Sequence, residues 1–241
     1  MLAGCGNSAP RSSSAPIRRN WRFFMVRLHG TADGSLARIQ IAILAKAPIA
    51  GLAKTRLIPA LGPKRAARLH RSLTRHTVRC AMEADLGQVT LWCTPNAEHR
   101  FFRALRRTAG LPCLVQTSGD LGARMHMAFR LHCFEGPLLL IGTDCPMLTA
   151  EHLREAARQL IVGADAVFYP AEDGGYVLVG LRRPQAALFE EMPWGTSDVM
   201  ALTRERASRA GLKTCELETL WDVDQPVDVM RLRALRAQTA P

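Results

Sequence analysis

Short apolar runs alternate with longer amphipathic stretches along the chain from residue 39 onward. Each run is bounded by turn residues, which is typical of buried strands, and the stretches between them have helical periodicity. The predicted strands are 39–45, 89–93, 112–116, 138–141, 166–169 and 213–217. The predicted helices are 63–84, 96–107, 151–161, two pieces within 185–210, and a last one that reaches 236. Asn96 is the predicted cap of the second helix. This alternation predicts an α/β domain around a mostly parallel sheet.

The run at 138–141 is followed by Gly142, Thr143 and Asp144. Asp144 therefore stands just past the carboxyl end of a predicted central strand, which is the edge where open α/β sheets bind ligands. Capping of the next helix is the alternative role for this acid, but Thr149 is better placed to be that cap. We therefore expect Asp144 to take part in chemistry.

The loop after the first strand combines small residues with cations. Small side chains let backbone amides approach a ligand, and the cations can neutralise phosphate oxygens. Neither the P-loop pattern nor the dinucleotide fingerprint is present. The small residues are Ala50, Gly51 and Ala53, and the cations are Lys46, Lys54 and Arg56.

Three later turns also contain residues suited to a site. The turn at 117–125 has Gly119 and Gly122 at the start of a predicted helix, where free amides could meet an anion. The stretch 170–181 reads as a hairpin turning at Gly174 and Gly175. Near the end of the chain, Asp222 and Asp224 bracket one valine and should face the same side of an extended segment.

Composition limits the classes of protein. The chain has 241 residues, 32 Lys and Arg against 21 Asp and Glu, and a formal charge of +11, which favours anionic partners in general. No nucleic-acid motif accompanies the charge, so we expect no nucleic-acid partner. Seven scattered cysteines without a C-x-x-C pair indicate reduced thiols, no zinc site and a cytoplasmic protein. No apolar run is long enough to span a membrane.

The chain divides into two parts by composition. Residues 1–37 are rich in Ser, Arg, Pro and Gly, and we expect a disordered extension or a start codon assigned too far upstream, with Met25 as the alternative start. The composition of this stretch also resembles an organelle transit peptide. Residues 38–237 are expected to form the single folded domain.

Five motifs together resemble the DUF2064 family. They occur in order between residues 39 and 235 as A-K-A-P-x-x-G-x-x-K-T-R-L, G-D-L-G-x-R-M, G-T-D-C-P, D-G-G-Y-x-L-x-G-L and W-D-V-D-x-P-x-D. That family is similar to the nucleotide-diphospho-sugar transferases, is often described as a glycosyltransferase of arsenosugar biosynthesis, and is distantly similar to the phospholactate guanylyltransferases. The resemblance implies a Rossmann-like GT-A fold that binds a nucleotide at its amino-terminal half, with a small antiparallel hairpin.

The resemblance also implies roles for particular residues. Asp144, Asp224 and Asp222 would bind Mg²⁺ or Mn²⁺, and Asp144 and Lys54 would be catalytic residues. An inverting reaction would also need a general base, and Asp173 is the candidate for this third catalytic residue. The nucleotide would contact Ala45, Lys46, Gly51, Lys54, Arg56, Asp120 and Arg124, and the acceptor would contact Gly174, Gly175, Tyr176 and Trp194.

The resulting hypothesis is a metal-dependent transferase that uses a nucleotide-activated donor. Such a cation stabilises the negative charge that develops on a nucleoside diphosphate or pyrophosphate leaving group. We expect a glycosyltransferase that moves a sugar from a nucleotide sugar to a small-molecule acceptor. A nucleotidyltransferase that uses an NTP and releases pyrophosphate remains open, as does a non-catalytic nucleotide-binding module. A nucleophilic role for Cys145 is disfavoured because no histidine is an obvious base for it.

Overall fold

The protein, described from a computed structural model, forms one seven-stranded sheet within residues 39–238. The strand order across the sheet is β3-β2-β1-β4-β6-β5-β7, so β4 is central. The strands are β1 (Gln40–Lys46), β2 (Val89–Thr94), β3 (Cys113–Val115), β4 (Leu138–Ile141), β5 (Ala166–Pro170), β6 (Tyr176–Leu181) and β7 (Thr214–Glu216).

Strand β6 runs against the direction of its neighbours. It pairs antiparallel with both β4 and β5, whereas the remaining pairs of the sheet are parallel. The first residues of β6 therefore lie at the same edge as the last residues of β1, β4 and β5. The turn between β5 and β6 therefore lies at this edge, together with the loops that follow β1 and β4.

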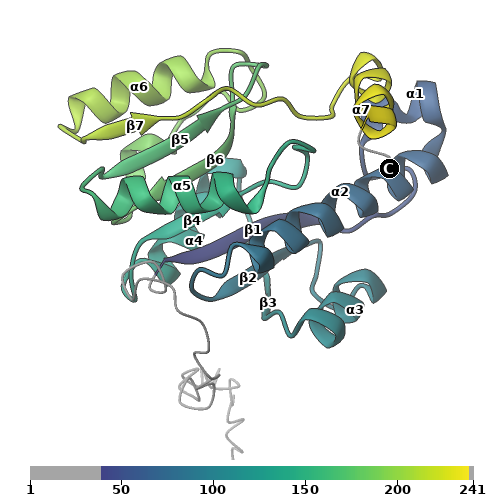
Figure 1. Cartoon of the computed structure of the whole chain (residues 1–241), viewed down its shortest axis with the longest axis horizontal. Helices are drawn as coiled ribbons and strands as arrows, with labels where there is room; N and C mark the ends of the chain where they lie inside the picture. The colour runs from purple at the N-terminus through teal and green to yellow at the C-terminus, as the bar shows by residue number, and fades with distance from the viewer. Residues whose placement is uncertain (1–38, 239–241) are drawn as a thin grey trace, which may run out of the picture. The chain divides into compact units, whose positions relative to one another are not determined.

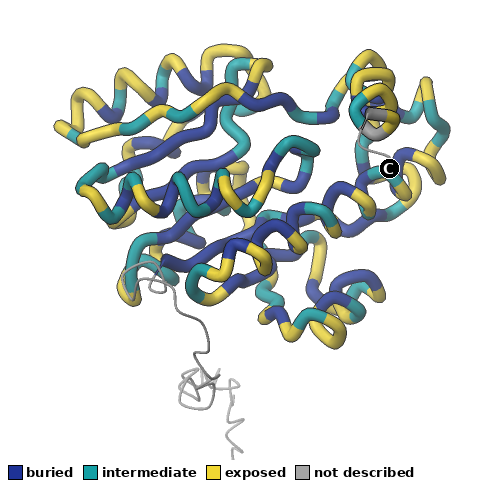
Figure 2. The backbone as a smooth tube through the Cα atoms, in the orientation of Figure 1, coloured by how far each residue is buried: buried dark blue, intermediate teal, exposed yellow. Residues whose placement is uncertain are grey.

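Helices cover both faces of the sheet (Figure 1). Helices α2 (Pro63–Glu83), α3 (Arg100–Ala109) and α5 (Ala150–Ile161) contribute to the core on one face. Helices α4 (Leu121–His132) and α6 (Val199–Arg209), with the short 3₁₀ helix η3 (Ala186–Leu188), contribute to the core on the other. Figure 2 shows the central strands buried while the helices expose their outer faces. Burial of both sheet faces explains why the strands read as continuous apolar runs.

A third, smaller core joins the two ends of the domain. It contains the turn formed by η2 (Thr55–Leu57) and α1 (Ile58–Leu61), part of α2, and the C-terminal helix α7 (Pro226–Gln238). Leu57, Leu73, Val223 and Leu232 are buried in it, at 4 % exposure or less. The segment that carries Asp224 is thereby packed against the loop that follows β1.

The predicted fold class is confirmed, with differences in two elements. The helix predicted from Asn96 begins only at Arg100 and is capped by His99, because the Asn96 side chain accepts a hydrogen bond from the Glu98 amide and forms a turn instead. The first helical piece predicted after residue 185 is only the 3₁₀ turn η3, consistent with Pro193 disfavouring helix just before it.

The cap predicted for the next helix is also different. Helix α6 has Asp198 at its N-cap position, without a side-chain capping bond, whereas Thr196 or Ser197 was expected there. By contrast, Thr149 caps α5 as predicted and forms a capping box with His152. Within residues 39–238, no helix has the length and apolar character needed to cross a membrane. The extension predicted at residues 1–37 lies outside the residues described.

Candidate functional site

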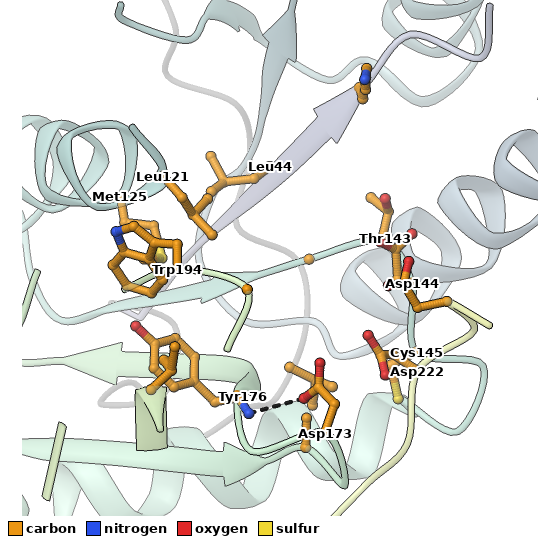
Figure 3. Close-up of a pocket in the computed structure, with 18 of the residues that line it drawn as sticks. Leu44, Leu121, Met125, Thr143, Asp144, Cys145, Asp173, Tyr176, Trp194 and Asp222 are labelled. Atoms are coloured by element: carbon orange, nitrogen blue, oxygen red, sulfur yellow. Dashed lines mark hydrogen bonds between the residues drawn. The ribbon is translucent and has the colours of Figure 1, made fainter. Parts of the chain in front are cut away.

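A cavity of about 500 Å³ opens at the edge of the sheet where β1, β2 and β4 end and β6 begins. Side chains from both halves of the chain line it. Figure 3 shows Leu44, Leu121 and Met125 on one side of this space and Asp144, Cys145 and Asp222 on the other, with Tyr176 and Trp194 near the apolar side. The cavity thus has an apolar end and an acidic end.

Lys54 joins the two predicted metal-binding parts of the chain. Its ammonium lies 2.9 Å from Asp144 Oδ2 and 3.6 Å from Asp224 Oδ1, and its side chain is only 4 % exposed. Arg56 forms a further ion pair with Asp224. The backbone of Lys54 is left-handed, with φ of 51°, which turns the chain at the entry to η2. Asp144 and Asp224 therefore converge on the ammonium group of Lys54.

The pKa values at the acidic end diverge. Burial would raise the pKa of Asp144, but Lys54 and His70 outweigh burial and lower this pKa to about 2. Burial, followed by the charge of Asp173, raises the pKa of Asp222 to about 6. Burial also raises the pKa of the Cys145 thiol to about 11, so a thiolate nucleophile is disfavoured at neutral pH. Neighbouring carboxylates thus have different affinities for protons.

His70 is a site residue that the sequence analysis missed. It is 4 % exposed on α2, and its Nε2 lies 2.8 Å from the Lys46 carbonyl oxygen. Because a carbonyl only accepts, Nε2 carries a hydrogen, and Nδ1 faces Asp144 Oδ1 at 3.7 Å. A histidine at a core position of the helix was the signal in the sequence that could have found it.

Most of the predicted site residues line this one cavity. They are Lys46, Lys54, Arg56, Arg124, Asp144, Asp173, Gly175, Tyr176, Trp194, Asp222 and Asp224. Of the further polar residues that line it without having been predicted to do so, three lie at strand ends, namely Thr94, Gln116 and Thr143. Each of these three lies at or just after the end of a strand, so the rule that identified Asp144 could have found them.

Four predicted site residues are not among those that line the cavity. The Asp120 carboxylate caps α4 by accepting a hydrogen bond from the Ala123 amide. Gly174 fits beneath Ser197, whose carbonyl oxygen would be 2.2 Å from an added Cβ. Ala45 is fully buried, and Gly51 is exposed with φ of 87°. The positions of these four residues in the structure indicate local structural roles.

Gly122 allows a contact within the protein where an approach to a ligand was expected. A Cβ at this position would lie 2.3 Å from the Phe189 carbonyl oxygen and 3.0 Å from Trp194 Nε1. The glycine therefore lets the segment before α6 pack against the start of α4. This packing holds Trp194, whose ring meets the Tyr176 ring edge-to-face at 6.4 Å, at the wall of the cavity.

The acidic end has ligands of the kind that Mg²⁺ and Mn²⁺ prefer. Carboxylate oxygens are available from Asp144 and Asp224, and the buried Asp144 Oδ1 has no hydrogen-bond partner. Within residues 39–238, no group of three or more His, Cys, Asp or Glu is arranged to hold a metal ion. A cation here would therefore need phosphate or water oxygens as further ligands, and Lys54 would have to move from between the carboxylates.

Comparison with protein families identifies a match over residues 77–196, to the family described as uncharacterized protein conserved in bacteria (DUF2064). The matched range includes three of the five motifs in full. Comparison with curated proteins finds no match.

Solved structures share the fold. A Desulfovibrio desulfuricans G20 protein, provisionally described as a nucleotide-diphospho-sugar transferase, is 27 % identical with a TM-score of 0.72, over 80 % of this chain and 86 % of that one. The 4-diphosphocytidyl-2C-methyl-D-erythritol synthase of Anaerococcus prevotii DSM 20548 is 11 % identical with a TM-score of 0.56, over 86 % and 100 % of the two chains.

A glycosyl-transferring structure is similar as well. Glucosyl-3-phosphoglycerate synthase of Mycobacterium tuberculosis, in complex with Mn²⁺ and UDP, is 9 % identical with a TM-score of 0.52, over 86 % and 81 % of the two chains. At such identities the last two comparisons show the fold alone. Together with the family match and the D. desulfuricans structure, they place this protein among the GT-A-like folds, and residues 77–196 match the DUF2064 family.

Proposed function

We propose that the protein is a divalent-metal-dependent transferase that uses a nucleotide-activated donor, and specifically a glycosyltransferase that moves a sugar to a small-molecule acceptor. The observation that carries the proposal is the convergence of Asp144 and Asp224 on the Lys54 ammonium, with Arg56 paired to Asp224. The transferase class agrees with the D. desulfuricans relative, and the cavity has room for a nucleotide.

The charges of the cavity explain why a metal ion would be needed. Its lining contains four cationic side chains and four aspartates, and the formal charges of these eight groups balance. A diphosphate would gain little net attraction from such a lining. Adding a divalent cation makes the lining positive, and Mg²⁺ or Mn²⁺ would stabilise the charge of the leaving diphosphate. The four cationic residues are Lys46, Lys54, Arg56 and Arg124.

The side chains of the protein would divide the remaining work. Lys54 and Arg56 would move from the carboxylates to the phosphate oxygens and hold them during transfer. Asp173, in the turn between β5 and β6, accepts a hydrogen bond from the Gly175 amide through Oδ1. Its other oxygen would take the proton of the acceptor hydroxyl. Tyr176 and Trp194 would form the wall against which the acceptor packs.

The central test is Asp144→Ala, with Glu205→Ala on the surface of α6 as the matched control. Nucleotide and nucleotide-sugar binding is measured by calorimetry with and without Mn²⁺, and turnover by release of nucleoside diphosphate. We expect Asp144→Ala to lose a hundredfold or more of metal-dependent turnover while it still unfolds cooperatively. Unchanged turnover in this variant would refute the assigned role of Asp144.

The same assay separates the alternatives. Release of pyrophosphate from an NTP in the presence of a phosphorylated acceptor would replace the glycosyltransferase by a nucleotidyltransferase. Nucleotide binding that is equally tight without Mn²⁺, and without any turnover, would favour a non-catalytic binding module.

A further inference from the structure

Gln116 lies at a place in the cavity where a ligand can be distinguished by its hydrogen bonds. It follows β3, and it lines the cavity together with Thr94 and the apolar Leu44, Leu121 and Met125. Figure 3 shows these three apolar side chains at the end of the cavity opposite Asp144. A flat apolar ring would fit such a wall, while its polar edge would need partners from the strand ends.

The orientation of the Gln116 amide is fixed by the backbone. Its Nε2 donates to the Trp92 carbonyl oxygen at 2.8 Å and lies 3.4 Å from the Ala45 carbonyl oxygen. Carbonyl oxygens only accept hydrogen bonds, so the alternative orientation would place an oxygen against two oxygens. The amide nitrogen must therefore face β1 and β2, and Oε1 must face away from them.

The Oε1 atom remains available as an acceptor. Among residues 39–238 it has no described hydrogen-bond donor, and it is not among the fully enclosed polar atoms that lack a partner. An acceptor of fixed direction, beside an apolar wall, selects a ring that presents an N–H group at its edge.

We infer that Gln116 is a specificity residue whose Oε1 accepts a hydrogen bond from a ring or exocyclic N–H of the nucleobase of the donor. The inference rests on the proposed function, since it assigns the apolar end of the cavity to the base and the acidic end to the diphosphate. It also gives the direction of the hydrogen bond, in which Gln116 accepts and the base donates. A base analogue without that N–H should bind more weakly.

The test compares nucleoside diphosphates by calorimetry in the presence of Mn²⁺, using GDP, UDP, CDP and ADP with the wild-type protein. The preferred one is then compared with an analogue whose N–H is blocked, by methylation of the ring N–H for GDP or UDP and by dimethylation of the exocyclic amine for ADP or CDP, and both are measured with Gln116→Met. Gln159→Met, on the outer part of α5, is the control, and Mn²⁺ with inorganic pyrophosphate is the probe that has no base.

We expect the effects of base methylation and of Gln116→Met on the binding free energy to be coupled. Methylation should weaken binding roughly tenfold in the wild-type protein and much less in Gln116→Met, because the acceptor is then absent. Gln116→Met should bind the unmodified nucleotide roughly tenfold more weakly and pyrophosphate as the wild type does. The control should reproduce the wild-type values.

Three outcomes would overturn the inference. If methylation costs the same in the wild type and in Gln116→Met, the loss is steric and Gln116 does not contact the base. If methylation costs nothing in the wild-type protein, no N–H is recognised, whether or not the variant folds. Either result leaves metal-dependent nucleotide binding, and hence the proposed function, intact. If no nucleoside diphosphate binds to the wild-type protein with Mn²⁺, both the inference and the proposed function fail.

Discussion

Replacing Lys54 by methionine tests the charge arrangement of the site most directly. Methionine keeps an unbranched side chain of similar length but removes the ammonium that lies between Asp144 and Asp224. We expect the variant to be less stable than the wild type without a metal ion, and to be stabilised more strongly by Mn²⁺. A variant that loses a charge would thus gain affinity for a cation.

The magnitude follows from the two distances. With an effective dielectric constant of about 20, each contact is worth roughly 5 kcal/mol of Coulomb energy, and in bulk water about 1 kcal/mol. The lysine side chain is 4 % exposed, but those of Asp144 and Asp224 are 41 % and 33 % exposed, so solvent screens part of the attraction. After this discount, we expect a net loss of about 2 kcal/mol in the free energy of unfolding.

The loss should depend on pH. Lys54 helps to lower the pKa of Asp144 from 3.8 to about 2, so this stabilisation is fully present above pH 3.8 and is lost as the pH falls through 2. Urea unfolding of wild type, Lys54→Met and the exposed control Lys64→Met at pH 7 and at about pH 2 measures the loss and its pH dependence. A Mn²⁺ titration at pH 7 measures the gain from the metal ion. Equal stability of all three proteins, or an equal gain from Mn²⁺, would refute the reasoning.

Two further substitutions test the site and its packing. Because the pKa of Asp222 is raised to about 6, the native state binds more protons than the unfolded state between pH 3.8 and 6, and wild-type stability falls as the pH rises through this window. Asp222→Asn should therefore be more stable than wild type by about 1 to 3 kcal/mol at pH 8 and little different at pH 3.5 in urea unfolding; equal curves at both pH values would contradict this. Gly122→Ala places a Cβ 2.3 Å from the Phe189 carbonyl and should lower the melting temperature by several degrees, whereas Gly142→Ala, with nothing within 4 Å, should not.

The sequence was sufficient to predict the strands and the position of Asp144. Apolar runs such as 138–141 are explained by burial of both faces of the sheet. The direction of the strands determines which edge of the sheet binds ligands, and Asp144 follows a strand at that edge. Thr149 was identified as a cap because capping depends on neighbours in the sequence. Family, fold and transferase class could all be expected from ordered motifs.

Contacts between distant parts of the chain could not be predicted in the same way. Arg56 meets Asp224 across 168 positions, and their proximity depends on how α7 packs on α2. The space that Gly122 provides is filled by Phe189 and Trp194, which no local pattern relates to it. Gln116 has a fixed amide orientation only because β1 and β2 are neighbours. In each case the information lies in tertiary packing, which a reading of local spacing does not contain.

The packing of the last helix has a consequence for biosynthesis. The Val223 amide donates a hydrogen bond to the Asp144 carbonyl oxygen at 2.9 Å. The Asp228 carboxylate of α7 accepts hydrogen bonds from the Asp224 and Gln225 amides, so α7 holds the segment 223–225 in place. Ribosomes make proteins from the N-terminus, and every strand of the sheet is therefore translated before Asp224 can be fixed in place. A nascent chain still lacking α7 would have the sheet without the packing that places Asp224 beside Lys54, so the proposed site can be completed only after α7 has left the ribosomal tunnel.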